Sequence, residues 1–109
     1  MSSADVLLAM AQTDADPKAR AEAVYAYVRR AGTKGLPATL AIIDKDTEDS
    51  VKTRAVSGIA GLPADEAVPA LIQLARANKN LAVRKQAVSA LGQTKDPRAV
   101  TFLEEILKR

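Results

Sequence analysis

The stretch Leu81–Leu107, which reads LAVRKQAVSALGQTKDPRAVTFLEEIL, decides the fold. Its apolar residues recur at helical spacing, and no alternating run of the kind found in strands persists. Asn80 lies just before the first apolar run, and Asp96-Pro97 lies between the two runs. Asp and Asn are favourable helix caps, and Pro is favoured at the first helical position. The stretch therefore predicts two short amphipathic helices joined by a tight turn.

The same pattern occurs earlier in the chain at a constant offset of 32 residues. Large apolar, small and basic residues each keep to their own columns when the copies are aligned. These columns are Tyr27/Ile59/Leu91, Ala26/Gly58/Ala90 and Arg20/Lys52/Arg84. A fixed period of this kind is the signature of a repeat architecture.

The repeats predict one all-α domain over residues 1–109, made of a half repeat (4–16) and three repeats (17–48, 49–80 and 81–109). A single unit is too small to bury both faces of its helices, so neighbours must stack and share a core. We therefore expect an α-solenoid of antiparallel helix pairs with about seven helices. The expected helices are 4–12, 17–31, 36–44, 51–60, 65–77, 81–91 and 97–108. Thr47 is expected to cap the fourth, and Gly92 to close the sixth.

Composition excludes several classes of protein. The chain has 48% hydrophobic and 27% charged residues, which is ordinary for a globular domain, and only 3% aromatic residues. It contains neither Cys nor His, which removes disulfides, most zinc sites and imidazole-based catalysis. No run is long enough for a membrane span, and the N-terminus lacks the basic segment of a signal peptide. The sequence does not distinguish a cytoplasmic protein from a periplasmic one whose signal sequence has been removed.

The surface of the second helix of each repeat is the candidate binding site. Its positions combine small residues in the middle with charged residues at the rims, and Phe102 stands at the end. These positions are Lys34, Ala38, Ala41 and Lys45; Glu66, Ala70, Gln73 and Ala77; and Arg98, Phe102, Glu105 and Arg109. Such a groove can hold a helix or an extended peptide, with Phe102 as an anchor. The alternative is that Phe102 only covers the open end of the core.

The column Arg20/Lys52/Arg84 has two interpretations. It predicts either a ladder of cations for an acidic surface or phosphate backbone, or internal pairing with acids such as Asp16, Glu48 or Asp49 and with loop carbonyls. Internal pairing is favoured, since acids interrupt the stripe and aromatic stacking platforms are scarce. The acidic loop 44–49 lacks the Gly and Glu of a calcium loop, so we interpret it as a helix-capping loop.

One family resemblance covers nearly the whole chain. The pattern Val83-Arg84-x-x-Ala87-x-x-Ala90-Leu91-Gly92-x-x-x-Asp96-x-Arg98-Ala99-Val100 resembles the HEAT-repeat family, in its short bacterial form akin to phycobilisome-lyase HEAT-like repeats. The resemblance implies a helical-repeat fold and protein–protein binding. It implies no catalysis, because the residues of the motif are structural. No chromophore-binding or catalytic motif accompanies them here.

The expected function is therefore a non-catalytic scaffold, without cofactor or metal, that binds a protein or peptide on the second-helix face. The second helices usually line the concave side of such a solenoid. Two alternatives stay open: a nucleic-acid or acidic-surface binder that uses the basic column, and an accessory domain of a larger enzyme. Apolar residues at both ends, Leu7, Leu8 and Met10 and then Phe102, Ile106 and Leu107, lack an obvious cover. The chain is therefore expected to be a piece of a longer array or to self-associate through its ends. Glu104, at the column of Leu40 and Ile72, is expected to place a charge at a buried position that marks the last unit.

Overall fold

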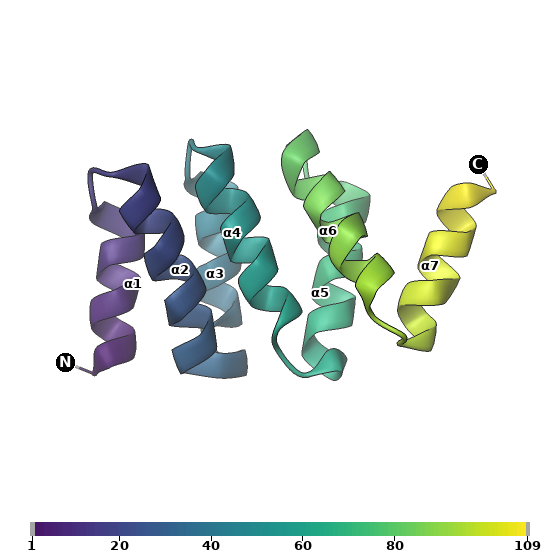
Figure 1. The fold of residues 1–109 in the computed structure, drawn as a ribbon, viewed down its shortest axis with the longest axis horizontal. Coiled ribbons are helices and arrows are strands. Elements are labelled where there is room, and N and C mark those ends of the chain that lie inside the picture. The colour runs from purple at the N-terminus through teal and green to yellow at the C-terminus, as the bar shows by residue number, and fades with distance from the viewer. Residues whose placement is uncertain (1, 109) are drawn as a thin grey trace.

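The computed structural model describes residues 2–108 and contains seven α-helices within them (Figure 1). They are α1 (Ser3–Thr13), α2 (Pro17–Ala31), α3 (Leu36–Lys45), α4 (Asp49–Ala60), α5 (Ala64–Ala77), α6 (Leu81–Gln93) and α7 (Pro97–Leu107). One short 3-10 helix, Gly32–Gly35, links α2 to α3. The molecule is elongated, 46 × 25 × 18 Å, because each helix pair stacks on the previous one. The predicted α-solenoid is confirmed.

Local signals in the sequence set most of the helix ends. The side chains of Asp16, Asn80 and Asp96 each accept a hydrogen bond from a backbone N–H in the first turn that follows, as predicted. Gly32 ends α2 with φ of 67°, a conformation that side chains other than glycine rarely adopt. At the start of the chain, Ser2 and Asp5 form a reciprocal capping box.

Two predicted helix ends are wrong. Thr47 does not cap α4; instead Asp46 Oδ1 accepts the N–H of Glu48 at 3.0 Å, and this turn lets the helix begin at Asp49. Gly92 does not close α6, which continues to Gln93 and ends at Thr94. The backbone of Gly92 has no positive φ. An exposed glycine without that conformation remains compatible with a helix.

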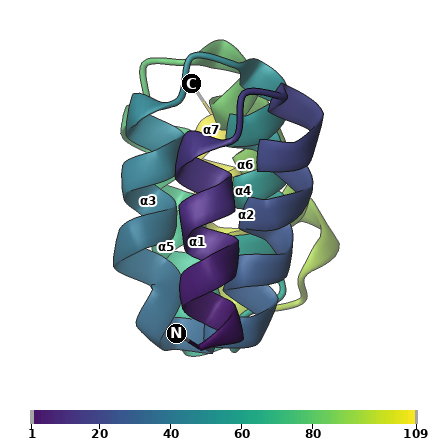
Figure 2. The same ribbon diagram turned by 90° about the vertical axis from the view of Figure 1, so that its left-hand side faces the viewer.

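The helices form two layers, with α2, α4 and α6 in one and α1, α3 and α5 in the other (Figures 1 and 2). The core between them is built from the repeating columns: Ala55, Ala87, Ile59 and Leu91 have no exposed surface, and Tyr27 is buried as predicted. Gly58 lets α2 and α4 approach closely, since a Cβ there would lie 3.1 Å from the Val28 side chain.

Neighbouring first helices share one recurring contact. Arg54 of α4 places its guanidinium 4.0 Å from the ring centroid of Tyr25 on α2. Gln86, at the equivalent position of α6, donates from Nε2 to Ser57 Oγ at 3.0 Å. Tyr25 and Ser57 are likewise equivalent positions, 32 residues apart. Tyr25 is half-buried, and Arg54 covers its ring.

The last helix, α7, differs from its predecessors in what it exposes. It contacts α6 about as extensively as α5 contacts α4, the equivalent pair of the preceding repeat, and it leans away from α6 in Figure 1. Phe102, at the position of Ala38 and Ala70, is only 5% exposed. On the same helix Val100 is 45% exposed and Glu104 is exposed. The expectation that Glu104 occupies a buried position is therefore wrong.

At the two ends of the stack some apolar residues are covered and others are exposed. Leu7, Leu8 and Ile106 are partly buried against the core, contrary to the expectation that they lack a cover. Met10 and Leu107 remain 41% and 83% exposed. None of the helices in residues 2–108 has the length and apolar character needed to cross a membrane.

Candidate functional site

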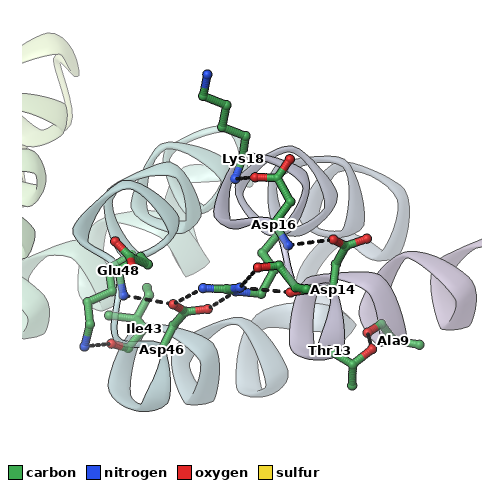
Figure 3. Close-up of polar contacts among 11 residues, drawn as sticks. Ala9, Thr13, Asp14, Asp16, Lys18, Ile43, Asp46 and Glu48 are labelled. Carbon is green, nitrogen blue, oxygen red and sulfur yellow. Dashed lines mark hydrogen bonds and ion pairs between the residues drawn. The ribbon is translucent and has the colours of Figure 1, made fainter.

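The first candidate, the basic column, is used for internal contacts. Arg20 Nε lies 2.9 Å from Asp46 Oδ2, and Arg20 Nη1 donates to the carbonyl of Asp14 at 2.9 Å (Figure 3). The side chains of this pair are only 14% and 9% exposed. Arg20, in the first turn of α2, therefore connects the loop before α2 to the loop after α3 through these two contacts.

The other two members of the column also face loops. Lys52 Nζ donates to the carbonyl of Ile43 at 2.8 Å, and Arg84 Nη1 donates to those of Asn78 and Lys79 at 2.8 and 3.0 Å. Internal pairing with loop carbonyls, the favoured interpretation, is thus confirmed. The acidic partner is Asp46, and the expected partners Asp16, Glu48 and Asp49 are wrong. The only signal for Asp46 in the sequence was the alternation of acidic residues in 44–49.

Asp46 is held in its charged form by these contacts. Burial disfavours its ionisation, but the hydrogen bonds from Arg20 and from the Glu48 amide outweigh that effect and lower its pKa. The Asp46 carboxylate thus serves as a structural anion between two loops.

The second candidate, the second-helix face, contains a cleft of about 490 Å³ between α3 and α5. Its lining is mostly apolar, with a few polar groups at the ends. The lining residues are Leu36, Leu40, Glu66, Pro69, Ala70, Gln73, Leu74, Ala77 and Asn78. We call this cleft the α3–α5 groove. Concave, apolar surfaces with a small number of polar groups are the usual form of binding sites.

The predicted site residues are divided among three clefts. Glu66 and Gln73 line the α3–α5 groove. Lys45 lines a smaller cleft of about 280 Å³ between α1 and α3. Arg98, Phe102 and Glu105 line one of about 350 Å³ between α5 and α7.

Of the other predicted positions, Ala41 lines the α1–α3 cleft, and Ala70 and Ala77 line the α3–α5 groove. Lys34 and Ala38 line none of the three clefts. Lys34 is exposed on the 3-10 helix, and Ala38 packs against the core. Arg109 lies outside the described residues. The predicted continuous strip is therefore a series of separate hollows, of which the α3–α5 groove is the largest.

The apolar floor of the α3–α5 groove was missed by the sequence analysis. Leu36, Leu40 and Pro69 contribute much of it, although the alanines of the second helices were expected to form the middle of the surface. The column of Leu40 was expected to be buried, and both leucines are in fact half-buried. Their spacing of one helical turn, next to the small Ala70 of the neighbouring helix, was the signal available for this hollow.

The charged residues between α5 and α7 form ion pairs with one another. Arg98 Nη2 lies 2.8 Å from Asp96 Oδ2 and 3.1 Å from Asp65 Oδ1. Arg76 lies 3.9 Å from Glu105 and 5.2 Å from the ring centroid of Phe102. Phe102 itself is buried, so of its two interpretations the structure supports the one in which it covers the core. It is not an exposed anchor for a partner.

The Asp96–Arg98 pair predicts a loss of stability in acid. The side-chain and backbone hydrogen bonds from Arg98 lower the pKa of Asp96 to about 2, below the ~3.9 of an unfolded chain. A lowered pKa stabilises the fold above about pH 4, and this stabilisation is lost as the pH falls toward 2. We expect urea denaturation curves to show that decline. Asp96→Asn keeps an accepting oxygen at the cap but has no proton to gain, so its decline should be shallower. Identical profiles for the two proteins would contradict the assignment.

The fold and its grooves define a class, the helical-repeat scaffolds, in which stacked helix pairs present extended binding surfaces. The comparison with protein families agrees: the family described as HEAT repeats matches residues 36–109. The chain belongs to the HEAT-repeat family, whose members are typically non-enzymatic and mediate protein–protein interactions. No curated protein and no solved structure matches the chain.

Proposed function

We propose that this protein is a non-catalytic scaffold that binds a helix or an extended peptide of a partner protein in the α3–α5 groove. The observation that carries the proposal is the groove itself, an apolar hollow of about 490 Å³ on the second-helix face. Membership of the HEAT-repeat family supports a protein as the partner. The absence of Cys and His from the chain supports the lack of catalysis.

The shape and chemistry of the groove indicate what the partner presents. Leu36, Leu40 and Leu74 provide an apolar floor, and Ala70 keeps the centre open for a large side chain. Glu66 and Asn78, at either end of the α5 stretch that lines it, provide polar groups. A partner helix with apolar residues at i and i+4, or a strand with one bulky side chain, fits this arrangement.

The proposal can be tested with a displayed peptide library selected on the immobilised protein. Ala77→Arg places a long cation in the groove, and Ala60→Arg places the same side chain in the other layer. Both alanines are exposed, so neither change disturbs the core. We expect Ala77→Arg to weaken binding of the selected peptides by at least about tenfold, because it removes apolar contact and buries a charge. Ala60→Arg should bind as the wild type does.

Backbone amide shifts of the labelled protein locate the bound peptide. Perturbations along α3 and α5 are expected. Perturbations confined to α2, α4 and α6, or equal binding by both variants, would show that the groove is not the site. Selection of no peptides at all would also count against the proposal.

A further inference from the structure

Within the described residues, the outward face of α6 is less buried than the equivalent faces of α2 and α4. Val24 of α2 and Val56 of α4 have no exposed surface, because in each case the next first helix covers them. The equivalent Val88 of α6 is only half-buried, and its neighbours Lys85 and Ser89 are exposed. Within residues 2–108 no further helix follows α6 in this layer.

A cleft of about 470 Å³ lies at this face, between α5, α6 and α7. The floor is apolar and the rim is basic. Ala75, Val88, Phe102 and Ile106 form the floor, and Arg76, Arg84, Lys85 and Ser89 form the rim. We call this cleft the α6–α7 edge.

The stack itself shows how a helix sits on such a face. Arg54 of α4 contacts Tyr25 of α2, and Gln86 of α6 contacts Ser57 of α4. The position of Arg54 and Gln86 in the repeat thus contacts the position of Tyr25 and Ser57 in the preceding first helix. Ser89 is the third member of the Tyr25/Ser57 column. A helix bound in the same way therefore places a long polar side chain over Ser89.

The charges of the α6–α7 edge select an acidic partner. Arg76, Arg84 and Lys85 surround the cleft, and Glu105 is the acid near Arg76. The Nη1 group of Arg84 is occupied by two loop carbonyls, but its positive charge still faces the cleft. Complementary charges steer and orient partners at such surfaces.

We infer that the α6–α7 edge binds an amphipathic helix of a partner protein, in the place that a further first helix of the stack would hold. The helix presents small apolar side chains to Val88, a polar side chain to Ser89 and a carboxylate to Arg84 and Lys85. This surface is separate from the α3–α5 groove, so the two proposals can fail independently.

A second copy of the chain is a poorer occupant of this position. Its exposed N-terminal helix, α1, belongs to the same layer as α3 and α5 and not to that of α6. Stacked onto α7 in register, α1 would continue the second-helix layer and would leave the place beside α6 empty. The apolar residues that α1 exposes, Val6 and Met10, therefore do not fill the α6–α7 edge.

A peptide with the sequence of residues 80–93 is a suitable probe, because α6 already binds α4 in the expected way. In the peptide Ser89 is replaced by Asp, and a lactam bridge joins the side chains at positions 85 and 89. The bridge holds the peptide helical and lies on the face of the peptide that points away from the protein. Asn80 contacts Asp49 at 2.7 Å and Gln86 contacts Ser57, so position 82 falls opposite positions 51–53 of α4. On the α6–α7 edge the equivalent positions are 83–85, which include Arg84 and Lys85. One peptide therefore carries Ala82→Glu and its control carries Ala82→Lys.

Fluorescence anisotropy measures binding of each labelled peptide to the protein. We expect the Glu peptide to bind at least about tenfold more tightly than the Lys peptide at low salt, with a smaller difference at about 0.5 M salt. Lys85→Glu in the protein should remove or reverse this preference. Ala77→Arg, in the α3–α5 groove, should leave it unchanged.

Three outcomes would overturn the inference. The first is equal or absent binding of both peptides. The second is a set of amide shift changes confined to α3 and α5. The third is sedimentation that depends on protein concentration while neither peptide binds, which would assign the edge to a second copy.

Discussion

Phe102→Ala is expected to lower the free energy of unfolding by about 3 kcal/mol, near the lower bound for truncation of a buried Phe. The Phe102 side chain is 5% exposed and lies between two clefts, where it separates α7 from α5 and α6. Its removal joins the two clefts and leaves α7 with few contacts. The estimate lies at the lower end because a terminal helix can move inward and fill part of the space. Urea denaturation followed by circular dichroism measures the change.

Leu107→Ala is the matched control for this prediction. Leu107 lies on the same helix and is 83% exposed, so its truncation should change stability by less than about 0.5 kcal/mol. Hydrogen exchange should show that Phe102→Ala lowers the protection of the backbone amides in α7 more than in α2 and α4. A loss below about 1 kcal/mol would mean that the ring contributes little to the core. The same reasoning makes Phe102→Ala unsuitable as a test of partner binding.

Most of the fold was predictable because one period of 32 residues runs through the chain. Repeated apolar columns fix which face of each helix is buried, and Asp16, Asn80 and Asp96 fix where three helices begin. Asp46 was not recognised as the organiser of its loop, because its partner Arg20 is 26 residues away and five other residues of that segment are also polar. Local rules describe helices well but do not show which loops meet.

The candidate site was less predictable than the fold. Helical positions showed which residues share the second-helix face, and two of these residues, Glu66 and Gln73, line the α3–α5 groove. The depth of a hollow depends on the distance between neighbouring helices, which a single side chain such as Phe102 can change. The exposure of Glu104 and the hollow at the α6–α7 edge both lie at the end of the stack, where the repeat pattern does not show what covers a column.

Gly58→Leu is expected to destabilise the protein by about 2 kcal/mol, in the range for overpacked cores. Gly58 lies on α4 in the small-residue column, and a Cβ there meets the Cβ and Cγ2 of Val28 at 3.1 Å. Val28 is fully buried and branched at Cβ, so it has no flexible end that can move aside. A larger side chain must therefore push α2 and α4 apart, and these two helices share one of the most extensive contacts in the molecule.

Gly92→Ala gives the opposite result and serves as the control. Gly92 lies within α6 with ordinary helical backbone, and nothing lies within 4 Å of the Cβ that alanine would add. Alanine should stabilise the helix there by about 0.5–1 kcal/mol, because it restricts the unfolded chain and favours helix. Midpoints of urea denaturation for wild type, Gly58→Leu and Gly92→Ala measure both effects. If Gly58→Leu were as stable as the wild type, the close approach of α2 and α4 would not depend on glycine, and the column Ala26/Gly58/Ala90 would need another explanation.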